Sequence, residues 1–365
     1  MKALRRAASF CEGHGLRAPI LMAPMAGACP PSLASAVAGA GGLGACGAVN
    51  MGPSQIRLWV DEFRQLSGGS GRLALNLWAP DPAPLRDEAT EARIRAFLER
   101  WGPPLDARAG DAALPQDFEA QCEAILEVKP NAISSIMGLF PPHIVQRAHA
   151  AGIPWFATVT TATEARAAAA AGCSALIAQG SEAGGHSGCF DAARGQAERC
   201  AVGLMSLIPA VCDAAPGLPV IGTGGITDAR GVAAALILGA SAVQVGTGLL
   251  RTPECGIPAA WSAAVASAQP EDTITTRAYT GRLARGVGNV YLDEAHGPAA
   301  PMAAPFPVQR GLTAPMRADA AHGAGDGARM QAWAGQSARL AEARPAGDVV
   351  ADMWLRAQEL LRSKE

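Results

Sequence analysis

The sequence predicts an α/β protein built on a closed barrel of eight strands. Eight short apolar runs alternate with longer, Ala-rich runs between residues 20 and 246. The apolar runs are nearly continuous, as expected for strands buried on both faces of a parallel sheet. A (β/α)8 TIM barrel takes about 250 residues, which the span from Ile20 to Cys255 fits. A doubly wound open sheet is the alternative, and it is disfavoured because the glycine motifs come late in the chain.

The alternation of the two kinds of run gives the order of the predicted elements. The predicted strands are residues 20–25, 43–49, 73–77, 132–137, 155–160, 175–179, 219–222 and 242–246. The predicted helices between them are residues 32–40, 53–66, 117–127, 142–151, 162–171, 202–214 and 228–238. Pro53 suits a first helical turn, where the backbone N–H has no partner.

Two segments do not fit the repeat. Residues 80–115 are rich in proline and charge, interrupt the third βα unit, and contain a predicted helix at 88–101. The tail contains the Pro-rich residues 298–315 and a predicted terminal helix at 349–362. Long loops often serve as lids. We therefore expect a barrel domain of residues 16–255, and a C-terminal helical extension of residues 256–365 that forms a smaller cap partly covering the active site together with the insertion.

Composition and charge exclude several classes of function. The chain has 49% hydrophobic and 17% charged residues and a net charge of −2, so it has a globular composition and nucleic acid is not an expected partner. Nine cysteines without a CxxC pair, and six histidines without ligand spacing, indicate neither a disulfide framework nor a metal site. No secretory signal or membrane span is present. We expect a cytoplasmic protein with no membrane partner, and a homodimer is left open.

A glycine cluster follows the sixth predicted strand, where barrel enzymes carry catalytic groups. His186 is framed there by four glycines, namely Gly180, Gly184, Gly185 and Gly188. Glycine lets the backbone approach a ligand closely and expose its N–H groups. We interpret His186 as a candidate catalytic group. The alternative is a histidine that is satisfied within its own loop.

Two further glycine clusters end the seventh and eighth predicted strands. Residues 220–228 contain Gly224-Gly225 before a predicted helix, and residues 244–248 contain Gly246 and Gly248. A Gly-Gly turn followed by a helix N-terminus favours an anion, and barrels often bind phosphate between these two loops. Together the clusters predict a phosphorylated ligand, although ordinary barrel turns are the alternative.

These motifs together resemble the nitronate monooxygenase family, formerly called 2-nitropropane dioxygenases. The resemblance extends from residue 16 to residue 289. The matching residues are Ala23-Pro24-Met25-Ala26-Gly27, Asn76, the run 179–186, Gly224-Gly225-Ile226 and Gln244-Val245-Gly246-Thr247. Related flavoproteins with similar motifs include NADH:quinone reductases and flavin-dependent enoyl-thioester reductases.

The resemblance implies a non-covalently bound FMN, held in the barrel domain. Ala23, Pro24 and Met25 would lie along the isoalloxazine ring. Asn76 and Gln179 would hydrogen-bond the polar parts of the flavin. The glycines that would allow the backbone to approach the cofactor are Gly184, Gly185, Gly224 and Gly225. The phosphate cradle would be completed by Gln244, Val245, Gly246 and Thr247.

The resemblance also implies a reaction, the oxidation of alkyl nitronates or nitroalkanes with O₂ to a carbonyl compound and nitrite. His186 would face the substrate, either donating a hydrogen bond to a nitronate or removing a proton from a nitroalkane. A second hypothesis is NAD(P)H-dependent reduction of quinones or enoyl thioesters, and a third is a non-catalytic phosphate- or flavin-binding barrel. Because the chain has two tyrosines, we expect Trp78, Phe140 or Phe190 as aromatic residues on the substrate side. The segment 277–289 resembles a late family motif to which we assign no role.

Overall fold

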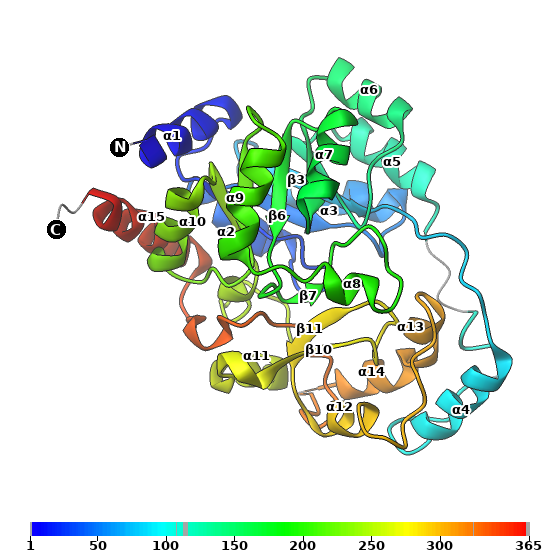
Figure 1. Cartoon of the computed structure of the whole chain (residues 1–365). Coiled ribbons are helices and arrows are strands. Elements are labelled where there is room, and N and C mark those ends of the chain that lie inside the picture. Colours follow the sequence, from blue (N-terminus) through cyan, green and yellow to red (C-terminus); the bar gives the residue numbers. More distant parts are fainter. Residues whose placement is uncertain (1, 107, 112–115, 324, 363–365) are drawn as a thin grey trace.

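Eight parallel strands form one sheet in the order β1-β9-β8-β6-β5-β4-β3-β2. Figure 1 shows the whole chain, with helices around this sheet. The computed structural model describes residues 2–106, 108–111, 116–323 and 325–362. The outer strands β1 and β2 meet, because Met22 N–H donates to the Leu43 carbonyl and Leu43 N–H donates to the Ile20 carbonyl, at 2.9 and 3.1 Å. This contact closes the sheet and removes its open edges. The predicted (β/α)8 barrel is confirmed, and the open doubly wound sheet is wrong.

Each barrel strand is followed by a helix that covers it. The strands are β1 (Ile20–Met22), β2 (Gly44–Gly47), β3 (Leu73–Trp78), β4 (Ala132–Ile136), β5 (Trp155–Val159), β6 (Ala175–Gln179), β8 (Val220–Thr223) and β9 (Ala242–Val245). The covering helices are α2 (Pro31–Gly39), α3 (Pro53–Leu66), α5 (Phe118–Glu127), α6 (Pro142–Ala150), α7 (Ala162–Ala170), α9 (Leu204–Ala214), α10 (Ala229–Leu238) and α15 (Ala346–Arg362). The side chains of Asp117, Thr161 and Asp228 cap three of these helices by accepting backbone N–H groups.

The first strand is shorter than predicted. Ala23 N–H still donates to the Val245 carbonyl at 2.8 Å, but Pro24 has no N–H with which to continue the ladder. The chain therefore leaves the sheet after Met22, and Pro24 and Met25 line a cavity at the barrel mouth.

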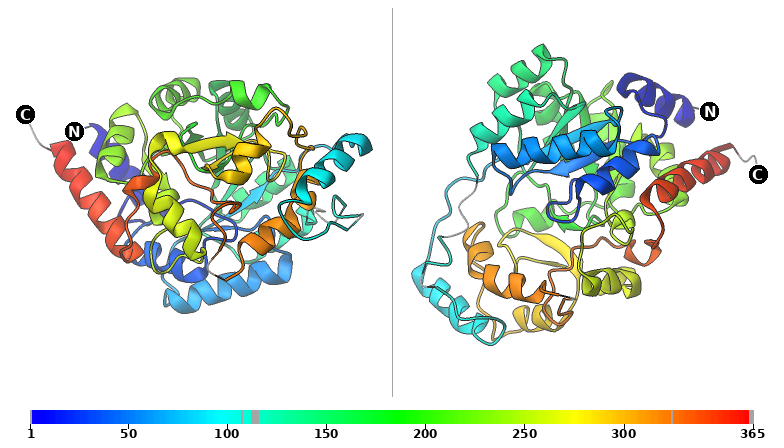
Figure 2. Two further views of the ribbon diagram at one scale, coloured as in Figure 1. Left: turned by 90° about the horizontal axis from the view of Figure 1, so that it is seen from below. Right: turned by 180° about the vertical axis from the view of Figure 1, so that it is seen from behind.

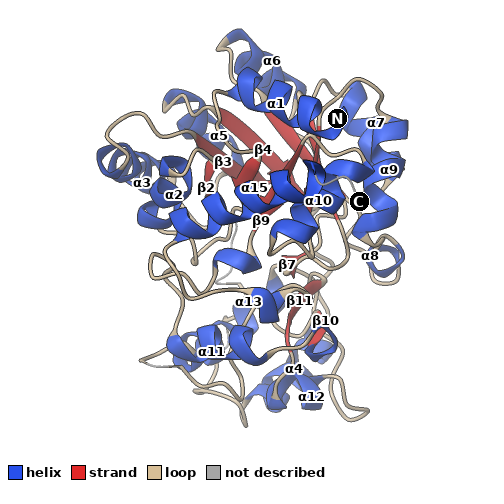
Figure 3. Cartoon of the chain, turned by 90° about the vertical axis from the view of Figure 1, so that its left-hand side faces the viewer, coloured by secondary structure: helices blue, strands red, loops and turns tan. Residues whose placement is uncertain are grey.

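The eighth covering helix comes from the far end of the chain. After β9 the chain leaves the barrel, builds the cap, and returns as α15, which packs against α10 and α2 (Figure 3). Its apolar side chains Val349, Val350 and Met353 are buried in the same core as the other barrel helices. The extension after residue 255 is thus divided between the cap and the barrel wall. The domain boundary at residue 255 itself stays a prediction.

The sequence analysis did not predict the helix α1 (Lys2–His14). It lies at the end of the barrel where the strands begin, away from the cavity at their C-terminal ends. Its Phe10 and Cys11 join a buried cluster with strand residues from inside the barrel, including Phe156 and Ile221. His14 lies edge-on to Phe156, with ring centroids 5.3 Å apart. The helix therefore plugs the end of the barrel that faces away from the strands' C-termini.

The insertion and part of the tail form the cap, as expected (Figure 2). Ile94 and Leu98 of the insertion share a buried cluster with Tyr279, Tyr291 and Leu312 of the tail. The helices of the cap and its connections are α4 (Glu88–Leu98), α8 (Gln196–Arg199), α11 (Ala259–Ser267), α12 (Val290–Ala295), α13 (Val308–Leu312) and α14 (Ala314–Ala320). A small antiparallel sheet consists, in this strand order, of β10 (Thr273–Thr276), β11 (Ala284–Val287) and β7 (Gly185–His186). Residues 107 and 112–115 of the predicted insertion lie outside the described residues.

No helix in the described part of the chain is long and apolar enough to cross a membrane. The cytoplasmic location and the homodimer stay predictions.

The plug helix gives a test of the fold. Phe10→Ala should lower the free energy of unfolding by about 3 kcal/mol, because it empties a buried position in the end of the barrel. Urea unfolding would measure the change. Ser9→Ala, on the exposed face of the same helix, should change stability by less than about 0.5 kcal/mol. Equal effects of the two substitutions would contradict the plug.

Candidate active site

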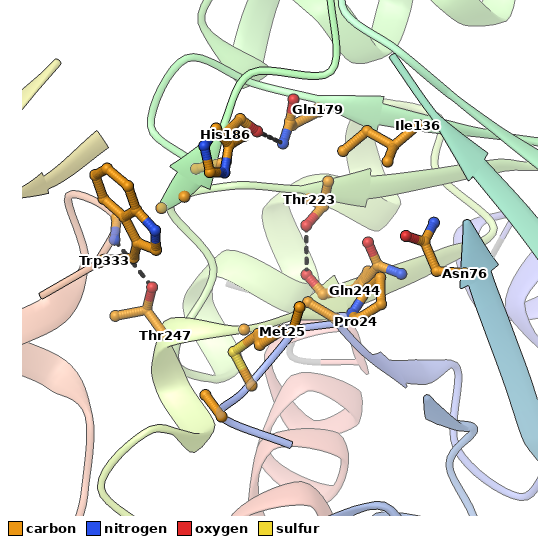
Figure 4. A pocket seen from close by; sticks show the side chains of 18 of the residues that line it. Pro24, Met25, Asn76, Ile136, Gln179, His186, Thr223, Gln244, Thr247 and Trp333 are labelled. Atoms are coloured by element: carbon orange, nitrogen blue, oxygen red, sulfur yellow. Dashed lines mark hydrogen bonds between the residues drawn. The ribbon is translucent and has the colours of Figure 1, made fainter. Parts of the chain in front are cut away.

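A cavity lies at the C-terminal ends of the barrel strands, between the barrel and the cap (Figure 4). Of the fourteen site residues predicted from the sequence, all but Val245 line it. They are Ala23, Pro24, Met25, Asn76, Gln179, Gly184, Gly185, His186, Gly224, Gly225, Gln244, Gly246 and Thr247. The side chain of Val245 is fully buried in the outer core between the strands and helices. Only the backbone of Val245 is near the cavity, since its carbonyl accepts Ala23 N–H.

The two late glycine clusters line this cavity with Gly224, Gly225 and Gly246. Gly224 and Gly225 have φ values of 108° and 67°, which glycine adopts without strain. A Cβ on Gly224 would lie 3.0 Å from the Ala183 nitrogen, so the turn also packs tightly against the loop after β6. Within the described part of the chain, the N–H groups of Gly224, Gly225 and Gly246 have no protein acceptor.

The helix N-terminus after this turn is less free than we expected. The Asp228 carboxylate accepts the N–H groups of Arg230 and Gly231, at 2.9 and 3.3 Å. It therefore occupies the first turn of α10, and an anion at this edge of the cavity would depend on the glycine N–H groups instead.

Five side-chain amides line the cavity, namely Asn50, Asn76, Gln179, Gln244 and Gln331, and the three predicted from the sequence are not equivalent. Buried Asn76 donates from Nδ2 to the Ser134 hydroxyl at 2.9 Å, which directs its orientation. Gln244 makes no side-chain hydrogen bond with the described residues. Gln179 is held by its own loop, because Nε2 donates to the His186 carbonyl at 3.0 Å and Oε1 accepts Gly188 N–H at 2.6 Å, which leaves the second N–H of Nε2 available. Gln179 thus braces the loop that carries the histidine.

His186 lies on β7 with its ring between two tryptophans. Its ring centroid is 4.9 Å from that of Trp78 and 5.3 Å from that of Trp333. Its Nε2 lies 2.8 Å from the hydroxyl oxygen of Thr280, which is a buried residue of the cap. Burial, as the largest cause, and the positive charges of Arg282, Arg310 and Arg317 together lower the pKa of the imidazole to about 3. His186 is therefore neutral at neutral pH.

Two arginines that the sequence analysis missed also line the cavity. Arg310 and Arg317 come from the α13–α14 region of the cap. Burial lowers the pKa of both, and the neighbouring Arg310 charge helps to lower that of Arg317 to about 10, so both remain charged at neutral pH. One sequence signal could have found them, since no acidic residue occurs from Val308 to Arg317.

Comparison with known proteins fits this geometry. A family model described as nitronate monooxygenase matches residues 10–355. The chain belongs to the nitronate monooxygenase family. A probable nitronate monooxygenase of Staphylococcus aureus (strain Newman) is 32% identical over 348 residues, which cover 95% of this chain and 96% of that protein. Members of this family are flavoenzymes, and the chain is therefore an oxidoreductase that acts on a small molecule.

Two solved structures extend the comparison. A nitroalkane oxidase from Streptomyces ansochromogenes has 33% identity and a TM-score of 0.84, covering 96% of this chain and 98% of its own. FabK from Thermotoga maritima has 26% identity and a TM-score of 0.74, covering 97% of this chain and 96% of its own. The similarity thus includes the cap as well as the barrel.

The cap supplies parts of this family member's cavity that no motif had indicated. Gln331, Trp333 and Ser337 line it from a segment without regular structure. The Thr247 hydroxyl accepts Gly335 N–H at 2.9 Å. A Cβ on Gly184 would lie 2.5 Å from the Ala334 carbonyl carbon, so this contact requires glycine.

The aromatic residues of the substrate side were predicted in part. Trp78 lines the cavity, as expected. The prediction for Phe140 and Phe190 is wrong, because Phe140 is buried beside Trp155 and Phe190 packs against the outer core. Trp333 takes the place that we had expected for them.

The 277–289 segment of this nitronate monooxygenase family member joins the cap to the barrel. Arg282 makes a buried ion pair with Asp81 at 2.6 Å and donates to the Cys189 carbonyl at 2.8 Å. Arg277 pairs with Glu198 at 2.9 Å. The segment also carries Thr280, the partner of the histidine.

Thr280 gives a test of the site geometry. Thr280→Val should lower the free energy of unfolding by about 1–3 kcal/mol, because a buried ring nitrogen of His186 loses its partner. It should also shift the NMR signals of the imidazole nitrogens. Thr280→Ser keeps the hydroxyl and is the matched control. If serine and valine shifted those signals equally, the hydroxyl contact would be refuted.

Proposed function

We propose that this protein is an FMN-dependent nitronate monooxygenase, which oxidises alkyl nitronates with O₂ to a carbonyl compound and nitrite. The observation that carries the proposal is a positively charged cavity beside a neutral histidine. Such a cavity suits a substrate that is already an anion, as a nitronate is, and does not require a strong base.

The cavity fits FMN in three respects. Free N–H groups at Gly224, Gly225 and Gly246 match the acceptor oxygens of a phosphate. Asn76 and Gln244 can hydrogen-bond the polar edge of a flavin ring. Ala23, Pro24 and Met25 form a largely apolar wall along which a flat ring could lie. When bound there, FMN would supply the electron chemistry of the reaction.

The arginine pair favours an anionic substrate. Arg317 donates to neutral acceptors only, namely the Thr313 hydroxyl, the Gln331 amide oxygen and the Arg310 carbonyl. Arg310 donates to the Asn50 amide oxygen at 2.5 Å. Neither makes an ion pair with a described carboxylate, so both charges lie partly buried without a counter-charge. Because a buried charge is costly unless paired, an anion that enters the cavity is stabilised there.

The histidine supports the nitronate over the neutral nitroalkane. With its pKa near 3, His186 is a weak base for removing a proton from carbon. If the Thr280 hydroxyl donates to Nε2, the ring proton lies on Nδ1 and can be donated to an oxygen of the nitronate. The role that the chain's own residues support is thus binding and orientation of an anion. Quinones and enoyl thioesters are neutral at the reacting end, which makes the reductase the second candidate.

The proposal predicts an activity and its charge dependence. The purified protein should consume O₂ and release nitrite from propyl-2-nitronate. Arg317→Gln should raise the KM for the nitronate about 10- to 100-fold, because a charge-assisted hydrogen bond is lost. Arg317→Lys should raise this KM less. Arg100→Gln should leave the KM unchanged, because Arg100 is an exposed cap arginine outside the cavity. Equal KM values for all three variants would contradict the role of the charge.

A second prediction concerns the histidine. For nitronate oxidation, initial-rate kcat/KM should show no ionisation near pH 6.5, because His186 already remains neutral far below that pH. His186→Asn should retain FMN and raise the KM for nitronates, because the hydrogen bond from the imidazole to the nitronate oxygen is lost. A pH step near 6.5 that disappears in His186→Asn would show that the imidazole titrates normally and would refute the neutral state.

A further inference from the structure

A second, larger cavity adjoins the first on the side of the cap. Its volume is about 930 Å³, and the volume of the cavity that contains His186, measured in the same way, is about 280 Å³. The two share the wall residues Trp78, Arg310 and Arg317. We call the larger one the outer cavity, and these three residues its neck. A molecule held by the arginines can therefore extend in either direction.

Much of the outer cavity wall is apolar. Several elements contribute, including the segment after β3, the loop after β4 and the helices α13 and α14. Its apolar lining residues include Phe118, Met137, Phe306, Val308 and Ala314. Trp78 and Phe306 lie against each other at the neck, with ring centroids 5.8 Å apart.

The charged groups in the outer wall differ from those at the neck. Arg282 is paired with Asp81, with one guanidinium nitrogen 2.6 Å from both carboxylate oxygens. Arg86 pairs with Asp111 and with Glu91. The charge of these arginines is thus already balanced, whereas Arg310 and Arg317 at the neck have no described carboxylate partner. An anionic group is favoured at the neck, and an uncharged group is favoured beyond it.

We propose that the outer cavity binds an apolar substituent of the substrate, and that the preferred substrates are nitronates with a long alkyl or an aryl group. This inference rests on the proposed function, because it takes the nitronate as the anionic head. The head would lie between the arginines and His186, and the substituent would pass the Trp78–Phe306 contact into the outer cavity. Each methylene that leaves water there improves binding.

A homologous series of substrates tests the proposal in the wild-type holoenzyme. From butyl to octyl nitronate, KM should fall roughly two- to fourfold for each added methylene. Straight-chain carboxylates from butyrate to octanoate provide the same head charge and tail without the reaction. Their dissociation constants, measured by calorimetry, should fall by a similar factor.

A variant that fills the outer cavity tests whether the alkyl substituent of the substrate binds there. Ala314→Phe should raise the KM for octyl nitronate at least tenfold relative to that for ethyl nitronate, and should weaken octanoate binding in the same proportion. Ala318→Phe is the matched control, because Ala318 is exposed on the same helix and lines neither cavity. It should leave both ratios unchanged.

The outcomes separate this inference from the proposed function. Turnover of ethyl nitronate with KM values that are flat from butyl to octyl would overturn the inference alone. Equal chain-length dependence in Ala314→Phe and Ala318→Phe would also overturn it, because the tail would then lie elsewhere. If no nitronate is oxidised, the proposed function fails. Chain-length-dependent carboxylate binding that Ala314→Phe abolishes would still establish the outer cavity as an apolar subsite.

Discussion

The backbone pairing of β7 with β11 is the contact on which the active cavity depends. His186 and Gly185 belong to the loop after a barrel strand, and they pair with Ala284 and Arg285 of the cap. Arg285 also donates to the Ser181 carbonyl at 2.9 Å, which holds the same loop a second time. Because the histidine itself is part of this pairing, the cap and the loop that carries His186 cannot move independently without breaking it.

This junction determines the electrostatics of the cavity. The cap delivers two guanidinium groups without a carboxylate partner to the side of the cavity that also holds an imidazole. The low pKa of His186 and the proposed preference for an anionic substrate have one common origin, since burial and the same positive charges disfavour imidazolium and would favour an anionic ligand. On the barrel side, the same cavity is lined by Gly224, Gly225 and Gly246, whose backbone N–H groups have no acceptor among the described residues.

Sequence reasoning found the barrel and much of the cavity, because both are encoded locally. An apolar run predicts a buried strand, and a glycine pair such as Gly224-Gly225 predicts a turn, from only a few neighbouring residues. The plug helix α1 was missed although Ala7, Phe10 and Cys11 follow a helical spacing. Trp333 and Thr280 could not be assigned, because only contacts between distant segments bring them to His186. The flavin contact predicted for Gln179 stays a prediction, since its amide holds its own loop and keeps a second N–H for a ligand.

Anaerobic mixing of the FMN-loaded protein with substrate tests the central claim most directly. The account predicts that the absorbance spectrum of the flavin changes on mixing with propyl-2-nitronate. NADH and NADPH at the same concentration should leave that spectrum unchanged. Arg317→Gln should require more nitronate for the same change. Rapid bleaching by NADH or NADPH, with no response to the nitronate, would contradict the account and identify the protein as a pyridine-nucleotide-dependent reductase.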